Sequence, residues 1–263
     1  MYFCLSQIII ILNIKTMSIK QYLDSTYLKT AVQAGLKESQ NILFVKKLIQ
    51  EAINENFKLI MIRPDMVSMA RKMIVDANSK VEIGTVIDFP VGRSGVEAKL
   101  NEARQAIQDG ADDLDFVCNY EAFKKGDLDL VKQEILKCTQ LGLKNNKVVK
   151  WIIEVAALSD KQIIQLSALV KNLAVSNFRE KDYASIFVKS STGFYKTENN
   201  LPNGATVLSI KLMLENAAPL PVKAAGGVRT YDEALAMIQL GVKRIGTSGA
   251  KAIANGEIAQ SGY

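Results

Sequence analysis

From about residue 21 onward, short apolar runs alternate with longer segments whose apolar residues recur at helical spacing. Parallel strands need a crossover connection, which a helix usually supplies, so this alternation is typical of consecutive βα units. Eight strands are expected, over residues 23–28, 58–62, 82–89, 113–119, 148–155, 186–191, 222–225 and 244–247. Eight such units predict an α/β fold in which the sheet closes into a (β/α)₈ barrel, the TIM barrel.

Helical spacing is clear in three of the intervening segments, residues 43–53, 128–138 and 230–240. The last of these also has a start and a stop signal, because Thr230 and Glu233 match a capping box and Gly241 follows the final apolar residue. No repeat, low-complexity stretch or Pro/Gly-rich linker divides the chain. We therefore expect one barrel domain over residues 17–255.

The two ends of the chain are expected to lie outside this domain. Residues 8–12 form an apolar run, but no basic region precedes it, no clear cleavage site follows it, and it is far too short to span a membrane. We interpret Met17 as the initiator and residues 1–16 as an N-terminal extension. Residues 256–263 are expected to form a flexible C-terminal tail.

The composition restricts both the chemistry and the compartment. The chain contains no histidine, which excludes Ser-His-Asp and Cys-His catalysis and all imidazole metal ligands. Three widely spaced cysteines without a Cys-x-x-Cys pair indicate neither a disulfide framework nor a zinc cluster, and a cytoplasmic protein fits best. The net charge is +6, but the lysines are scattered, so we expect anionic metabolites rather than nucleic acid as partners.

Two lysines are predicted to reach the same rim of the barrel, where reactive groups project from the carboxyl ends of strands. Lys189 precedes a hydroxyl-rich loop after the sixth strand, and Lys223 lies on the seventh. A lone strand lysine is more often an ordinary rim residue. Two neighbouring ammonium groups disfavour each other's charge and lose hydration, so their pKa values should fall and leave an amine able to attack a carbonyl.

Acidic residues on neighbouring strands complete the predicted site. Alternation on the fourth strand places Asp113 and Asp115 on one face. Asp115 facing the lysines would either neutralise a buried lysine or shuttle protons, and the sequence leaves both roles open. On the fifth strand Lys150 and Glu154 share a face, and we interpret them as a buried structural ion pair behind the site.

Glycine-rich loops follow the seventh and eighth strands, at Gly226-Gly227 and over residues 246–249, which include Ser248. Each loop offers unobstructed backbone N–H groups next to a helix N-terminus, which suits an anion. One such loop is a weak signal because turns use glycine routinely. Both occur where barrels commonly hold phosphate. The chemistry implied is imine formation with a small carbonyl compound that bears a phosphate.

The segments around both lysines resemble the deoxyribose-phosphate aldolase family. The match rests on FVKSSTGF over residues 187–194 and VKAAGGVRT over residues 222–230. It begins at Leu23-Asp24-Ser25-Thr26, passes through GADDLD at residues 110–115 and reaches RIGTS at residues 244–248, so it covers nearly the whole chain after Met17.

The resemblance implies reversible cleavage of 2-deoxy-D-ribose 5-phosphate to acetaldehyde and D-glyceraldehyde 3-phosphate, in deoxyribose catabolism, without metal or organic cofactor and in a homodimer or higher homo-oligomer. Lys189 matches the Schiff-base lysine, Lys223 the second lysine that lowers its pKa, and Asp115 the acid that relays protons. The substrate-binding candidates are Asp24, Thr192, Gly193, Gly226, Gly227 and Ser248, with Lys150 as a further candidate close to the site.

Some positions depart from the better-known bacterial members or are shared with only some relatives. Met61 stands where some relatives carry cysteine, Phe194 where some carry a phosphate-side lysine, and Gly249 where many carry a second serine. These changes concern binding more than chemistry. The terminal Tyr263 matches a tyrosine that in some relatives reaches the active site, although a terminal tyrosine is more often simply disordered.

Other classes of protein remain open from the sequence. A different phosphate-binding barrel enzyme, such as a transaldolase-like Schiff-base aldolase or an isomerase, would share the glycine loops but need not pair Lys189 with Lys223. A non-catalytic sugar-phosphate-binding or regulatory protein would bind without turnover. A metal-dependent aldolase is disfavoured, because such enzymes rely on histidine ligands.

Overall fold

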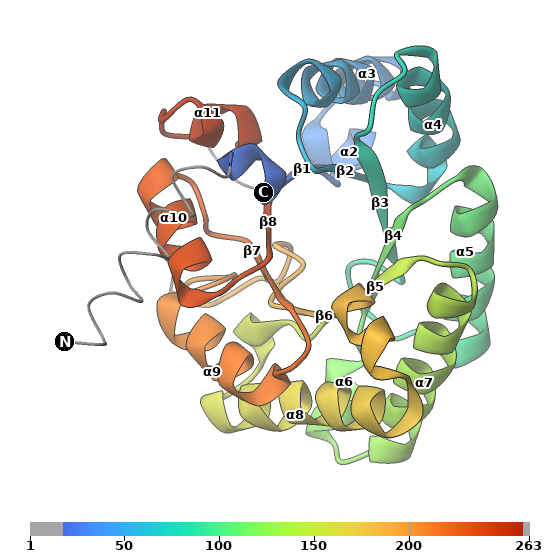
Figure 1. Ribbon diagram of the computed structural model, residues 1–263, viewed down its shortest axis with the longest axis vertical. Coiled ribbons are helices and arrows are strands. Elements are labelled where there is room, and N and C mark those ends of the chain that lie inside the picture. The colour runs from blue at the N-terminus through green and yellow to red at the C-terminus, as the bar shows by residue number, and fades with distance from the viewer. Residues whose placement is uncertain (1–17, 200, 260–263) are drawn as a thin grey trace.

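The computed structural model describes residues 18–199 and 201–259, and its centre is a closed barrel of parallel strands (Figure 1). Each strand pairs with the next along the chain, and the eighth pairs with the first. This confirms the predicted (β/α)₈ barrel. The strands are β1 (Leu23–Tyr27), β2 (Leu59–Ile62), β3 (Glu82–Ile87), β4 (Asp113–Val117), β5 (Val148–Ile152), β6 (Ile186–Lys189), β7 (Val222–Ala225) and β8 (Arg244–Thr247).

Helices surround the barrel on its outside (Figure 1). The α-helices are α2 (Ala31–Ala34), α3 (Glu38–Glu55), α4 (Val67–Asp76), α5 (Val96–Asp109), α6 (Tyr120–Lys124), α7 (Leu128–Lys144), α8 (Asp160–Asn177), α9 (Val207–Ala217), α10 (Tyr231–Leu240) and α11 (Ala250–Ala254). Short 3₁₀ segments are η1 (Ile19–Gln21), η2 (Pro64–Met66), η3 (Val155–Ala157) and η4 (Glu180–Ser185). No helix in these described stretches is long and apolar enough to cross a lipid bilayer.

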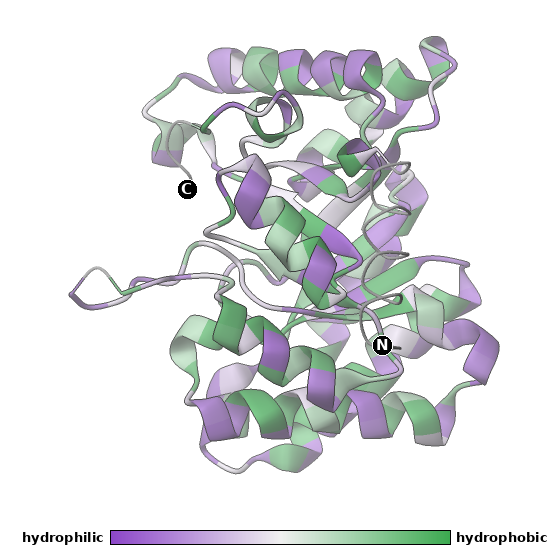
Figure 2. Cartoon of the chain, turned by 60° about the vertical axis from the view of Figure 1, so that its left-hand side comes forward, coloured by the Kyte–Doolittle hydropathy of each residue, from purple (hydrophilic) through white to green (hydrophobic). Residues whose placement is uncertain are grey.

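Helix α10 begins and ends where its sequence signals predict. Thr230 and Glu233 form the reciprocal capping box, and Gly241 closes the helix in the left-handed conformation. Its apolar face is buried through Ala234 and Met237, among others. Figure 2 shows the same mixture of hydrophilic and hydrophobic residues along the other outer helices, as expected for helices that bury one face against a sheet.

Several strands are shorter at their carboxyl ends than the alternation predicts. The third was expected to reach residue 89 and ends at Ile87, and the fifth was expected to reach residue 155 and ends at Ile152. Asp88 and Glu154 have φ angles of 54° and 58°, and a strand residue cannot adopt this left-handed conformation. The chain therefore turns into a loop before the apolar pattern ends, so Glu154 lies in a loop and not on β5.

The barrel interior is divided between an apolar and a charged half. Leu28, Leu59, Met61 and Val86 form a small apolar cluster on the side of β1 to β3. Buried acidic and basic side chains occupy β1 and β4 to β8. Barrel interiors are usually filled by branched apolar residues. The charged half is therefore the candidate functional region of the barrel.

Candidate active site

Lys189, Lys223 and Asp115 meet inside the barrel. The two lysines are register partners on the adjacent strands β6 and β7. Their Nζ atoms lie 2.8 Å and 2.9 Å from the same carboxylate oxygen, Oδ2 of Asp115 on β4. All three side chains are buried. The structure thus brings together the three residues that the sequence nominated for catalysis, although Asp115 lies in the middle of its strand and not at its end.

Lys189 is held in a form that readily loses its proton. Its pKa is lowered to about 8, mainly by burial; the charge of Lys223 also lowers it, and the carboxylate of Asp115 opposes both effects. The largest cause is therefore lost hydration and not the second lysine, which the sequence argument had stressed. Burial alone would raise the pKa of Asp115, but the charges of Lys150, Lys189 and Lys223 hold it well below its usual value.

Lys150 does not pair with Glu154, so the predicted ion pair of the fifth strand is wrong. Its Nζ contacts Asp113 Oδ2 at 2.5 Å and Asp115 Oδ1 at 2.9 Å. Alternation fails to predict the partner because Glu154 lies beyond the end of β5 and its left-handed backbone turns it toward the loop after β6. Lys150 instead occupies the second oxygen of Asp115 and fixes its orientation.

Asp24 and Arg244 join the first and last strands beneath the lysines. Asp24 is the second residue of β1, where it contacts Lys223 Nζ at 2.6 Å and Arg244 Nη2 at 2.6 Å. Arg244 was missed in the sequence, although its position on the same face as Lys223, its register partner, was a usable signal. A Cβ at Gly246 would lie 3.2 Å from Lys223 Cε, so the glycine leaves room for the lysine.

The charges of this cluster do not balance when every group is ionised. Three carboxylates, Asp24, Asp113 and Asp115, face four basic groups, Lys150, Lys189, Lys223 and Arg244. Lys150 and Lys223 each contact two of the carboxylates, whereas Lys189 contacts one. An unbalanced buried charge is costly. Loss of a proton from Lys189 restores neutrality with the smallest loss of ion pairing.

The two glycine loops lie side by side and line one cavity of ≈ 20 Å³. The residues that line it are Gly226, Gly227, Val228, Arg229, Gly246, Thr247, Ser248 and Ala259. Gly226 and Gly227 have φ angles of 77° and 85°, which explains the two glycines. A Cβ at Gly249 would lie 2.1 Å from Ala259 Cβ, so a serine there would not fit beside the returning chain. Tyr263 lies outside the described residues.

Thr192 and Gly193 connect the lysine cluster to these loops. Gly193 O accepts a hydrogen bond from Asn203 Nδ2, and Ala205 N donates to Gly226 O. Residues that follow the nucleophile on the chain thus contact the first glycine loop through Ala205. Phe194 packs edge-on against Phe89, with ring centroids 5.0 Å apart.

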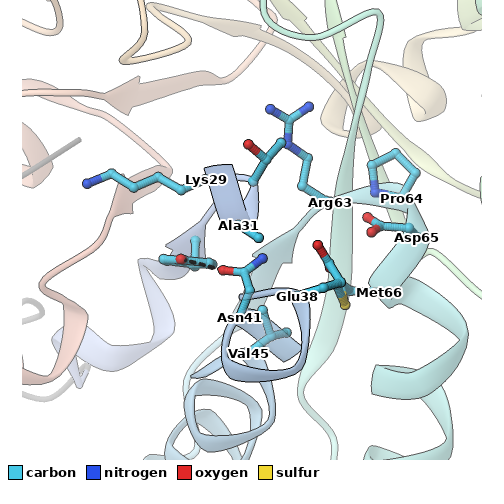
Figure 3. Close-up of a pocket in the computed structure, with 11 residues that line it drawn as sticks. Lys29, Ala31, Glu38, Asn41, Val45, Arg63, Pro64, Asp65 and Met66 are labelled. Atoms are coloured by element: carbon cyan, nitrogen blue, oxygen red, sulfur yellow. Dashed lines mark hydrogen bonds between the residues drawn. The ribbon is translucent and has the colours of Figure 1, made fainter. Parts of the chain in front are cut away.

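A larger pocket lies at the carboxyl ends of β1 and β2, next to helix α3 (Figure 3). It has a volume of ≈ 320 Å³ and is lined among others by Lys29, Glu38 and Asp65. Arg63 borders it and is held by a hydrogen bond from Nε to Leu28 O at 2.8 Å. None of the predicted catalytic residues lines this pocket.

The inner wall of this barrel holds a lysine of lowered pKa, a second lysine and a carboxylate that both contact. These are the groups that a Schiff-base aldolase needs. The family comparison agrees with this class, because the model of the DeoC/LacD family aldolase matches residues 23–255. The chain belongs to this family.

Curated relatives and a solved structure extend the match. A deoxyribose-phosphate aldolase from Thermococcus gammatolerans is 38% identical over 91% of this chain and 96% of its own length. One from Streptococcus pneumoniae is 35% identical over 94% of this chain and 100% of its own length. The tetrameric deoxyribose phosphate aldolase from Aeropyrum pernix superposes with a TM-score of 0.71 at 25% identity, over 90% of this chain and 89% of that one.

Proposed function

We propose that the protein is a deoxyribose-phosphate aldolase, which reversibly cleaves 2-deoxy-D-ribose 5-phosphate to acetaldehyde and D-glyceraldehyde 3-phosphate. The observation that carries this proposal is the amine of Lys189, which is buried, has a pKa of about 8 and shares one carboxylate oxygen with Lys223. The names of the relatives supply the substrate.

In the proposed mechanism the neutral amine of Lys189 adds to the C1 aldehyde, and the carbinolamine loses water to give an iminium ion. The C3 hydroxyl then gives its proton to Lys223, which lost one in the dehydration step, and becomes an aldehyde, while the electron pair of the C2–C3 bond moves into the iminium to form an enamine. Protonation at C2 and hydrolysis release acetaldehyde and restore the amine. The iminium nitrogen is the electron sink, so this chemistry needs neither a metal nor an organic cofactor.

The neighbouring groups handle the protons and the charge. Asp115 stays ionised beside three lysines, so its carboxylate stabilises the positive iminium nitrogen. Lys223 donates the proton that the carbinolamine hydroxyl needs to leave as water, and Asp115 relays it. Lys150 holds Asp115 in position. Asp24 acts through Lys223, which it orients, and not by direct contact with the reacting carbon.

The loops are proposed to bind the rest of the substrate. The backbone N–H groups of Gly226, Gly227 and Ser248 would receive the phosphate, and Thr192 and Gly193 would border the carbon chain. A cavity of ≈ 20 Å³ has room for about one water molecule. Phosphate binding therefore requires the wall formed by Ala259 to move outward.

The proposal also covers the compartment, the oligomeric state and the partners of the enzyme. Its three cysteines suit a reducing cytoplasm, and the tetramer of the Aeropyrum pernix protein supports a homo-oligomer here. A sugar phosphate is the proposed small-molecule partner, and nucleic acid and membrane are not.

Borohydride trapping tests the proposed function. The protein is incubated with 2-deoxy-D-ribose 5-phosphate and sodium borohydride and then mapped by mass spectrometry. Reduction of the acetaldehyde imine leaves an ethyl group on Lys189 Nζ, which we expect in the wild-type protein and not in Lys189→Met. An ethylated lysine elsewhere, or none, would contradict the proposal. A transaldolase-like enzyme would release no acetaldehyde, and a regulatory protein would bind the sugar phosphate without turnover.

A further inference from the structure

Glu154 is a buried carboxyl group that the proposed mechanism leaves without a role. It follows β5 and is 1% exposed, with a φ angle of 58°. Hydrogen bonds from Ile153 N to Lys189 O and from Val155 N to Ser190 O hold the backbone on both sides of it. The residue is therefore attached directly to the segment that carries the nucleophile.

The side chain of Glu154 orders the loop after β6 with one oxygen. Its Oε2 accepts hydrogen bonds from Thr192 Oγ1 at 2.5 Å and from Thr192 N at 3.2 Å. Thr192 Oγ1 in turn accepts one from Phe194 N at 3.0 Å. This chain of bonds fixes the turn that runs from the nucleophile toward the glycine loops.

The other oxygen of Glu154, Oε1, is buried and has no hydrogen-bond partner among the described residues. A buried carboxylate oxygen without a partner is costly, and so is a left-handed backbone at a residue other than glycine. The fold accepts both costs at one residue beside the nucleophile. Unsatisfied groups and local strain of this kind concentrate at functional sites.

The electrostatic surroundings fit a group that works near neutral pH. Burial raises the pKa of Glu154 to about 7, while the bonds from Thr192 and the charge of Lys189 on β6 oppose the rise. Tyr120 on α6 is a further titratable group near it, and the charge of Glu154 contributes to a Tyr120 pKa of about 12. Glu154 is therefore ionised, and able to accept hydrogen bonds with both oxygens, mainly above pH 7.

We propose that Glu154 is a specificity-determining residue of this aldolase site: its free oxygen Oε1 accepts a hydrogen bond from the C4 hydroxyl of the sugar phosphate. This inference rests on the proposed function. The substrate must extend from Lys189, which holds C1, toward the glycine loops, which hold the phosphate on C5. Glu154 is bonded to Thr192, three residues after Lys189 on the segment that leaves β6. Between C1 and the phosphate, C4 carries the one hydroxyl that does not change during the reaction.

The synthetic direction of the reaction tests this role with two acceptor aldehydes. One is D-glyceraldehyde 3-phosphate, whose hydroxyl becomes the C4 hydroxyl, and the other is 3-phosphooxypropanal, which lacks it. In Glu154→Gln the carboxylate oxygen is replaced, so we expect kcat/KM for the hydroxylated acceptor to fall about 10- to 100-fold. The value for the deoxy acceptor should change less than about threefold. Equal losses with both acceptors would overturn the proposal.

Two controls separate this inference from the proposed function and from misfolding. Glu180→Gln makes the same change at an exposed position and should affect neither acceptor. Trapping with acetaldehyde and borohydride should still ethylate Lys189 in Glu154→Gln, which shows an assembled site. If the wild-type protein is not ethylated either, the aldolase function itself is contradicted and not the role of Glu154.

The wild-type protein provides a test that needs no variant. Protonation of Glu154 below pH 7 removes the acceptor for the substrate hydroxyl. The ratio of kcat/KM for the hydroxylated acceptor to that for the deoxy acceptor should therefore fall as the pH decreases from 8 to 6. Because Lys189 titrates equally with both acceptors, its effect cancels in the ratio. A ratio that does not change over this range would overturn the proposal.

Discussion

Two clusters of buried charge in this protein contain the same residue types, lysine and carboxylates, but one has a reactive lysine and the other a structural lysine. Inside the barrel, Lys189 contacts one carboxylate, Asp115. Outside it, the equally buried Lys99 of α5 contacts Glu134 Oε2 at 2.5 Å, Val117 O at 2.8 Å and Gly92 O at 3.2 Å, with Asp88 at 3.6 Å. An ammonium group has three protons to donate, so Lys99 is saturated and Lys189 is not.

The number of acceptors therefore distinguishes a structural lysine from a reactive one. Lys99 and Glu134 tie the loop after β3 to the end of β4, because Glu134 Oε1 also accepts a hydrogen bond from Asn119 N. Lys189 loses its hydration without an equal replacement, which lowers its pKa. Burial and charge alone do not separate the two lysines, since both are nearly inaccessible to solvent.

Replacement of the unsaturated lysine should have the largest effect on activity and little effect on stability. Lys189→Met removes the nucleophile, so kcat should fall by a factor on the order of 10⁵ or more. The melting temperature should stay the same or rise, because a poorly compensated buried charge is lost. Steady-state kinetics and thermal unfolding measure the two effects. A strongly destabilised Lys189→Met would show that Lys189 is a structural lysine after all.

Replacement of the saturated lysine should have the opposite pattern. Lys99→Met leaves Glu134 buried without its partner, which should cost about 3–5 kcal/mol of unfolding free energy. Denaturant unfolding measures this loss. The double variant Lys99→Met with Glu134→Met should regain most of it, because no unpaired charge remains. If the single variant were as stable as the wild type, the contrast between the two clusters would not hold.

The second catalytic lysine should show an intermediate effect. Lys223→Leu removes a proton donor and should lower kcat/KM about 10²- to 10³-fold at neutral pH. It also removes a positive charge next to Lys189 and leaves Oδ2 of Asp115 to Lys189 alone, so the pKa of Lys189 should rise. Near-normal activity at pH 7 would exclude the proposed role of Lys223.

The smallest effect concerns pH and needs no substitution. The reaction requires neutral Lys189, whose pKa is about 8. As the pH falls below 8 the neutral fraction decreases, so kcat/KM with the deoxy acceptor should fall about tenfold for each pH unit. In Lys223→Leu this descent should begin at a higher pH. A flat profile between pH 6 and 8 would mean that another group supplies the nucleophile.

Local patterns in the sequence predict the fold better than they predict the partners of each charge. The eight strands and the start and end of α10 follow from periodicity and capping, which depend on near neighbours along the chain. Lys150 was assigned to Glu154 because the alternation was extended past the end of its strand. Its true partners come from β4, through the register that places Asp115 beside Lys150.

Local patterns also do not predict that Arg244 belongs to the buried charged cluster. Its partner Asp24 is 220 residues away and becomes a neighbour only where β8 meets β1. The sequence predicts an anion site at the two glycine loops, but it does not predict the size of the cavity that they line. Its small volume depends on Ala259, whose N–H donates to Arg229 O. Periodic patterns in the sequence do not predict a contact of this kind, because the two residues lie 30 positions apart.

The closing contact between Asp24 and Arg244 bears on when the protein becomes reactive. Lys223 takes one carboxylate from the first strand, and the enclosure that lowers the pKa of Lys189 is complete only after the eighth strand is in place. On the ribosome the unfinished chain exposes Lys189 to water, where a lysine has a pKa of about 10.4 and stays protonated. A smaller fraction of Lys189 is therefore neutral in the unfinished chain than in the closed barrel, where its pKa is about 8.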